Sequence, residues 1–170
     1  MSEAAAELSR PVSLLRLGSE PFRQHIAADA AERAALARRF DLLSLERLEA
    51  DIELVREIGG TILLTAAFEA EFAQECIVTL DPVASIVSEH FQLRYGPPEI
   101  EADMPDGDDE PAFEPLVGDV IDLGEAVAQE FSLALPPFPR SVDAVIETEP
   151  SDDSAEGPFA VLARLGRNEK

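Results

Sequence analysis

Apolar and acidic residues alternate over two adjoining stretches of this chain, and a glycine pair separates them. Such a period of two is typical of half-buried β-strands, whose successive side chains point to opposite faces. Gly59 and Gly60 supply the positive φ angles that a tight hairpin turn needs. The sequence therefore predicts an antiparallel hairpin with an acidic outer face. The apolar residues are Leu48, Ala50, Ile52, Leu54 and Ile58, then Ile62, Leu64, Ala66, Phe68, Ala70 and Phe72; the acids are Glu49, Asp51, Glu53 and Glu57, then Glu69, Glu71 and Glu75.

Other segments predict two helices and two further strands. Residues 12–17 and 83–95 have strand patterns, the second ended by Pro97 and Pro98. Asp29 with Glu32, and Asp122 with Glu125, have the spacing of a capping box in front of a helix. The resulting fold class is α+β: an antiparallel β-sheet with two packed helices, a mobile acidic loop and an acidic C-terminal linker.

The chain length and the placement of acidic runs predict one domain with tails. A chain of 170 residues can build one substantial core. We expect an N-terminal tail over residues 1–9 and a single domain over 10–145. The stretch 99–116 is poor in apolar residues and is expected to be an acidic loop within that domain. Residues 146–170 are expected to form an acidic linker and a short apolar C-terminal segment.

The charge of the chain constrains its partners. Asp and Glu number 35 against 13 Lys and Arg, which gives a formal net charge of −22. Bulk nucleic acid and anionic membranes repel such a chain, whereas complementary charge favours a basic protein. The first fifty residues nevertheless hold several arginines, and Arg33, Arg38 and Arg39 lie together on the predicted first helix. A direct RNA-binding module that uses these arginines is therefore the alternative.

Nothing in the residue pattern predicts an enzyme, a cofactor or a metal. Cys76 is the only cysteine, so no thiolate-rich zinc site can form, and it is read as a small buried residue at a strand end. His25 and His90 have no spacing that suggests a metal site or a triad, and are read as surface histidines. The chain contains no apolar run long enough to span a membrane, and a cytoplasmic location is expected.

Five segments in order resemble the YceD-like family of large ribosomal RNA subunit accumulation proteins. The resemblance extends roughly from residue 12 to residue 165 and implies a role in accumulation of the large-subunit (23S) ribosomal RNA. Many members have a Cys-x-x-Cys pattern where this chain has Cys76 and Thr79, and later cysteines near its Arg140 and Ser141, so a metal role is not carried over. The segments are residues 36–40, 75–82, 119–125, 135–140 and 158–163.

We therefore expect a ribosome-biogenesis factor without catalytic activity that acts through acidic surfaces on a basic ribosomal or assembly protein. Two hypotheses remain for the segment 119–125: its acids only cap the helix, or they also face the partner. RNA contact is expected to be weak or indirect. The candidate partner-binding residues are Asp106, Asp108, Asp109, Glu110, Asp119, Asp122 and Glu125, and the candidate RNA contacts are Arg33, Arg38 and Arg39.

Overall fold

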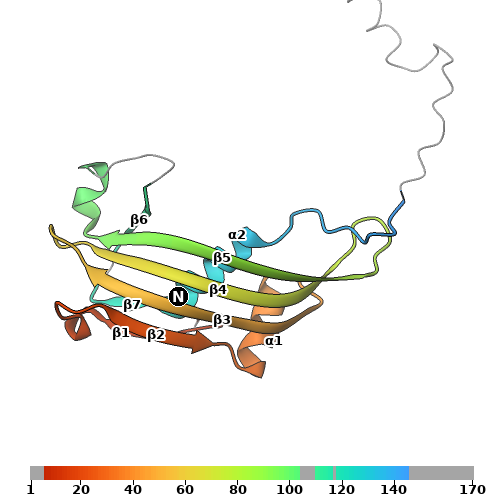
Figure 1. Ribbon diagram of the computed structural model, residues 1–170, viewed down its shortest axis with the longest axis horizontal. Coiled ribbons are helices and arrows are strands. Elements are labelled where there is room, and N and C mark those ends of the chain that lie inside the picture. Colours follow the sequence, from red (N-terminus) through yellow and green to blue (C-terminus); the bar gives the residue numbers. More distant parts are fainter. Residues whose placement is uncertain (1–5, 104–109, 117, 146–170) are drawn as a thin grey trace, which may run out of the picture.

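A twisted five-stranded sheet, in the order β2-β3-β4-β5-β6, forms the body of the molecule (Figure 1). A two-stranded ribbon, β1-β7, and two helices accompany it. The computed structural model describes residues 6–103, 110–116 and 118–145. In chain order the elements are β1 (Pro11–Ser13), the 3-10 turn η1 (Leu14–Arg16), β2 (Phe22–Ala27), α1 (Ala30–Arg39), β3 (Ser44–Arg56), β4 (Ile62–Glu75), β5 (Pro82–Gly96), the 3-10 segment η2 (Pro98–Asp103), β6 (Ala112–Pro115), β7 (Val120–Asp122) and α2 (Leu123–Ala134).

The predicted hairpin is confirmed as β3 and β4, and its apolar positions face one side of the sheet. Gly59 and Gly60 have φ angles of 108° and 91°, which only glycine adopts readily. From Leu48 to Leu54 and from Ile62 to Phe72, the predicted inward residues are buried. Ile58 is the exception, because β3 ends at Arg56 and this side chain is fully exposed in the turn.

Both helices pack against the apolar face of the sheet, behind it in the view of Figure 1. Phe131 of α2 is completely buried and meets the rings of Phe68 and Phe72 on β4 edge-on, at centroid distances of 6.3 and 5.5 Å. Phe40, at the end of α1, contacts the Phe131 ring at a centroid distance of 5.8 Å. Aromatic pairs in this geometry add to the stabilisation from burial. One side of the sheet is thus used for the core, and no helix of the described residues packs on the opposite face.

The two strand predictions outside the hairpin are confirmed only in part. The third long strand is present as β5 and stops before Pro97. The prediction of one strand over 12–17 is wrong at its second half, because the chain turns into η1 at Leu14 after Ser13 caps it. β2 was not predicted; its residues alternate Phe22, Gln24 and Ile26 inward, but the run is short and only Ile26 is buried.

The prediction that 99–116 lacks regular structure is wrong at both of its ends. Residues 98–103 form η2, and Ala112–Pro115 form β6, which pairs with the last residues of β5 in parallel. The sheet is therefore mixed rather than purely antiparallel. Leu116 donates its backbone N–H to the carbonyl of Gly96 at 2.7 Å, which extends this pairing. Residues 104–109, like the expected linker over 146–170, lie outside the described part of the chain.

The two predicted capping boxes differ in the structure. Asp29 and Glu32 form a complete box in front of α1. Asp122 caps α2 by accepting from the N–H groups of Gly124 and Glu125, but Glu125 does not reach back to the cap residue. The prediction of a second complete box is wrong, because an arginine from α1 binds the Glu125 carboxylate instead. Neither helix in the described residues is long and apolar enough to cross a lipid bilayer.

Candidate functional site

The face of the sheet opposite the helices carries rows of outward-pointing polar side chains. The strand register aligns His25, Asp51, Ala67 and His90 across β2, β3, β4 and β5. The neighbouring row contains Arg23, Glu53, Thr65 and Gln92. Residues of both rows lie on one side because successive side chains of a strand alternate between faces. We call this surface the outer face; no helix of the described residues covers it.

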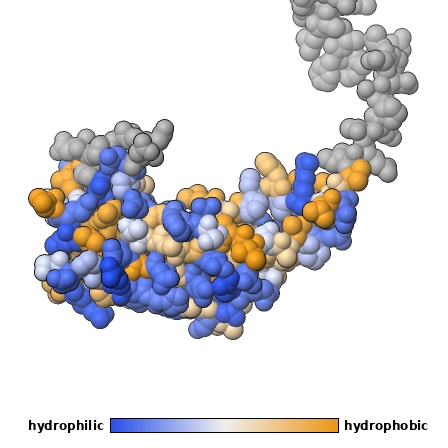
Figure 2. Space-filling view, in the orientation of Figure 1, coloured by the Kyte–Doolittle hydropathy of each residue, from blue (hydrophilic) through white to orange (hydrophobic). Residues whose placement is uncertain are grey.

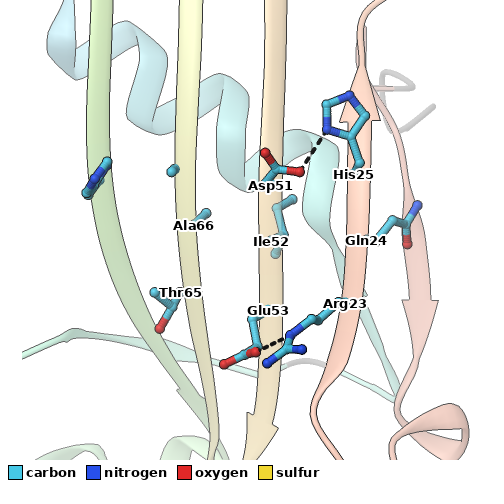
Figure 3. Close-up of a pocket in the computed structure, with 10 residues that line it drawn as sticks. Arg23, Gln24, His25, Asp51, Ile52, Glu53, Thr65 and Ala66 are labelled. Atoms are coloured by element: carbon cyan, nitrogen blue, oxygen red, sulfur yellow. Dashed lines mark hydrogen bonds and ion pairs between the residues drawn. The ribbon is translucent and has the colours of Figure 1, made fainter.

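A shallow depression of about 420 Å³ lies across the two rows (Figure 3). Ala67 is small, so the surface is hollow between Asp51 and His90. On the β2 side, Arg23 Nε donates to Glu53 at 2.5 Å, and His25 Nδ1 lies 2.9 Å from Asp51 Oδ1. Three strand spacings, about 14 Å, separate His25 from His90, so the two rings cannot share one metal ion.

Acidic residues predominate on the outer face. Arg47 lies among three glutamates and binds Glu49 at 2.9 Å, Glu71 at 2.7 Å and Glu69. One guanidinium cannot neutralise three carboxylates, so this end of the face keeps negative charge. Hydrophilic side chains cover much of the surface in Figure 2, with apolar patches between them. The outward acids of β3 and β4 are Glu49, Asp51, Glu53, Glu69, Glu71 and Glu75, against Arg23, Arg47 and Arg94 on β2, β3 and β5.

The candidate acids at 106–119 are only partly described. Asp106, Asp108 and Asp109 lie outside the described residues. Glu110 forms an ion pair with Arg94 at 3.4 Å. Asp119 is exposed, and its backbone carbonyl accepts a hydrogen bond from Leu14 at 2.8 Å. The structure thus gives Glu110 an internal partner and leaves the Asp119 side chain at the surface.

Asp122 and Glu125 are joined to other parts of the fold. Besides capping α2, Asp122 accepts from the Arg10 backbone N–H at 2.7 Å and from the Ser9 hydroxyl at 2.6 Å. Glu125 accepts two hydrogen bonds from Arg39, at 2.7 and 2.9 Å. This pairing holds the pKa of the Glu125 carboxyl below its ordinary value, against the opposing effect of burial. A candidate partner-binding residue and a candidate RNA contact are therefore paired with each other.

The three candidate RNA contacts on α1 have different environments. Arg39 binds Glu7 as well as Glu125, and these carboxylates raise the pKa of its guanidinium further. Arg33 donates to the carbonyl of Ala28 at 2.7 Å, just before the helix. Arg38 is exposed beside a depression between α1 and the start of β3. The positive charge of this helix is thus largely matched by nearby acids and carbonyls.

Cys76 is buried at the end of β4, as its residue type predicts. Its sulfur accepts from the backbone N–H groups of Ser141 at 3.3 Å and Thr79 at 3.4 Å. These donors lower the pKa of the thiol, whereas burial acts in the opposite direction. The backbone N–H of Ile77 also donates to the carbonyl of Pro139. Segments 76–81 and 139–141, distant in sequence, therefore meet around one sulfur.

A metal centre is not visible in the described part of the chain, where no three His, Cys, Asp or Glu side chains converge as ligands. The outer face itself could have been recognised as a surface from the sequence, since its acids alternate with the buried residues of the predicted hairpin. The alignment of its side chains in rows could not be predicted from the sequence, because it depends on the register between strands. The position of β2 also placed His25 and Arg23 on this face.

Comparison with known protein families shows to which family the chain belongs. The sequence model described as Large ribosomal RNA subunit accumulation protein YceD matches residues 64–165. The chain belongs to the YceD family. The match covers β4, β5, β6, β7 and α2, and includes four of the five segments noted in the sequence. No curated protein and no solved structure gives a significant match to the chain.

The family match also shows which parts of the molecule fall outside it. Residues 1–63, with β2, α1 and β3, precede the matched range, as does the segment 36–40. Two of the strands that build the outer face, β4 and β5, are within the YceD match, and the other two are not. The family is described by the accumulation of large-subunit ribosomal RNA, and the description names no catalytic reaction.

Proposed function

We propose that the protein supports accumulation or maturation of the large-subunit (23S) ribosomal RNA without catalysing a reaction, by binding a basic ribosomal or assembly protein. The acidic outer face carries this proposal. Its six outward carboxylates on β3 and β4 lie on a sheet face that no described helix covers. Rigid placement of charge favours recognition, because little conformational entropy is lost when the partner binds.

Electrostatics support a basic protein as the partner. A net charge of −22 attracts a cationic partner over a distance set by screening, about 8 Å at physiological salt. Complementary charge raises the association rate and disfavours wrong partners. The acidic run with Asp106, Asp108, Asp109 and Glu110 adds to the same field. The same negative field would repel the phosphate groups of RNA.

Direct RNA binding through the arginines of α1 is the competing function. The bidentate pairing of Arg39 with Glu125 disfavours RNA binding, since a phosphate would have to displace a carboxylate that already binds the guanidinium. Arg38 remains exposed. Of the arginines of α1, Arg38 alone has no hydrogen bond or ion pair within the described residues, and one arginine supplies few of the phosphate contacts that RNA affinity requires. The protein-binding function is therefore preferred.

The first experiment is an affinity capture from lysate with and without nuclease. A basic ribosomal protein should remain bound after RNA is digested, and cells that lack the protein should accumulate less large-subunit ribosomal RNA. Loss of all partners on nuclease treatment, with nanomolar RNA binding that Arg38→Ala abolishes, would favour the RNA-binding function.

A charge-matched pair of variants tests the outer face with the captured protein. Replacing Glu49, Asp51 and Glu69 by Gln, Asn and Gln keeps the pair between Arg47 and Glu71. The control removes the same number of charges by Glu20→Gln, Asp41→Asn and Asp143→Asn, at exposed positions elsewhere. The outer-face variant should associate about tenfold more slowly at low salt, and the control should change much less. Equal slowing by both would show that only net charge matters.

The acidic run is tested in the same assay. Replacing Asp106, Asp108, Asp109 and Glu110 by their amides should also slow association and flatten its salt dependence. A comparison of the two variants shows which acids lie nearer the partner. If neither variant alters association, the acidic-surface mechanism is wrong.

A further inference from the structure

Among the described residues, one long edge of the sheet is open. β5 pairs with β4 along its whole length, from Pro82 to Tyr95. On its other side, β6 pairs only with Leu93–Gly96. Figure 1 shows β6 beside the arrowhead end of β5 alone. In the described residues no strand or backbone hydrogen bond covers the remaining edge, from Val83 to His90.

The register identifies the backbone groups that face this edge. The Thr61 carbonyl accepts from Glu57 on the β3 side, so the even residues of β4 point their N–H and C=O groups toward β5. Their partners are the odd residues of β5. The Gly96 carbonyl, which accepts from Leu116, confirms that even residues of β5 point away from β4. The backbone groups of Ala84, Ile86, Ser88 and His90 therefore face the open edge.

This edge has few of the features that normally prevent strand addition. Lysine, inward charges, bulges and proline blunt exposed edges in most sheet proteins. From Val83 to Gln92 the chain has no Lys, Arg or Pro. Its only carboxylate is Glu89, which lies opposite the buried Phe68 and is the one inward charge on this edge. The register across β4 is continuous, without a bulge. Ile86 is 70% exposed beside the unpaired backbone. The edge is thus regular, mostly uncharged and partly apolar.

We propose that an extended basic segment of a partner protein adds to this edge of β5 as a further strand. The inference rests on the proposed function and specifies how the basic partner binds. Glu71 and Glu69 lie opposite Ile86 and Ser88 on the outer face. A strand added beyond β5 lies about 10 Å from these carboxylates, within reach of paired long side chains. Backbone hydrogen bonds supply affinity in this mode, and side chains supply selectivity.

Charge favours a basic strand over a second copy of the chain as the occupant of this edge. Two copies would each bring a net charge of −22, and this like charge opposes their association through the β5 edges. A lysine- or arginine-bearing strand instead meets acids of opposite sign. The observations therefore favour a basic strand.

The test measures hydrogen exchange at individual amides of the full chain. The probe is a synthetic peptide of about ten residues in which lysine alternates with threonine. It should slow exchange at Ile86, Ser88 and His90 by about tenfold or more at saturation. A peptide of equal charge that alternates lysine with proline should protect these amides much less, because half of its N–H donors are missing and its fixed φ angles favour the polyproline II conformation. Equal protection by both peptides would overturn the proposal.

Ser88→Pro and Ser88→Ala form the matched variants. The Ser88 N–H points to the open edge, so proline removes an edge donor without removing a bond to β4. Ser88→Pro should weaken binding of the lysine–threonine peptide by about tenfold or more, and Ser88→Ala by less than about twofold. If Ser88→Pro does not fold, Ile86→Lys replaces it with Ile86→Thr as its control; the lysine should weaken binding through repulsion of the basic strand.

Three results would contradict the inference. These are full binding by Ser88→Pro, amides that are already protected in the free chain, and self-association that Ser88→Pro abolishes. Failure of the proposed function is a separate result. A captured basic protein that binds Ser88→Pro as well as wild type would overturn the edge site alone, whereas outer-face and acidic-run variants that leave capture unchanged would count against the acidic-surface mechanism alone.

Discussion

The two helices begin with the same sequence pattern and differ in what their third residue binds. At the start of α1, Glu32 accepts from the backbone N–H of Asp29 at 2.8 Å and also binds Arg10. At the start of α2, Glu125 binds Arg39 from the end of α1. The cap aspartate acts locally in both helices, through N–H groups two and three residues ahead. The partner of the glutamate depends on which cation the tertiary structure brings close.

The surroundings of the two starts differ as well. The second position of α1 is Ala31, which is exposed. The corresponding position of α2 is Gly124, where an added Cβ would lie 2.5 Å from the backbone oxygen of Leu8. The N-terminal segment therefore lies directly on α2. Arg10 connects the two starts, since its backbone N–H binds Asp122 and its guanidinium binds Glu32.

Among the variants that compare the two helix starts, Asp122→Ala should cause the largest loss of stability. Asp122 serves the N–H groups of Gly124, Glu125 and Arg10 and the hydroxyl of Ser9. Loss of the cap and of the two contacts to the N-terminal segment should lower the free energy of unfolding by about 3 kcal/mol. Urea unfolding measures it. Asp122→Asn keeps an acceptor and should lose less; an alanine variant within about 0.5 kcal/mol of wild type would contradict the role assigned to this side chain.

Gly124→Ala should be next, with a loss of about 2 kcal/mol. Alanine is the better helix former by about 1 kcal/mol, but its Cβ must displace the backbone of Leu8. The reverse change at the matching place, Ala31→Gly, should cost about 1 kcal/mol through backbone entropy alone. Thermal unfolding of both variants gives the comparison. A stabilised Gly124→Ala protein would show that the N-terminal segment does not press on α2.

Asp29→Ala should destabilise the protein by about 1 kcal/mol, less than the equivalent change at Asp122. Asp29 accepts only from Ala31 and Glu32 within its own helix. The matched control is Asp29→Ser, which keeps a good capping oxygen and should stay near wild type. Equal losses for the alanine variants at positions 29 and 122, measured by urea unfolding, would show that the contacts to Ser9 and Arg10 add nothing.

The contrast between the helices also shows what the sequence could predict. Caps and turns depend on near neighbours, so Asp29, Asp122 and the glycine pair could be predicted. The hairpin could also be predicted, because alternation over two long strands requires one buried face. The pairing of Glu125 with Arg39 joins residues 86 positions apart, and no local pattern encodes it.

Short elements were missed for a related reason. β6 has only Ala112–Pro115 and gains its stability from pairing with the end of β5, which lies in a different part of the sequence. Its acidic surroundings predict a loop. The rows of the outer face likewise require the register of four strands. The acids of that face were visible in the sequence, but their arrangement around Arg47 was not.

The smallest expected effects concern the two glutamates and their dependence on pH. Hydrogen bonds from Arg10 and Arg39 hold the pKa values of Glu32 and Glu125 below the ordinary 4.5. Their contribution to stability is therefore complete above that pH and is lost as the pH falls through the lower, folded-state values. At pH 7, Glu32→Gln and Glu125→Gln should each cost less than about 1 kcal/mol, because both pairs are partly exposed.

Urea unfolding of the two Gln variants between pH 7 and pH 3 completes the comparison. Each variant should approach wild type as the pH falls, because protonation removes the same charge that the mutation removes. Glu32→Gln should lose slightly more, since Glu32 also binds the Asp29 backbone N–H. A gap from wild type that widens below pH 4.5 would mean that these carboxyl groups have raised pKa values, and it would contradict the pairing with Arg10 and Arg39.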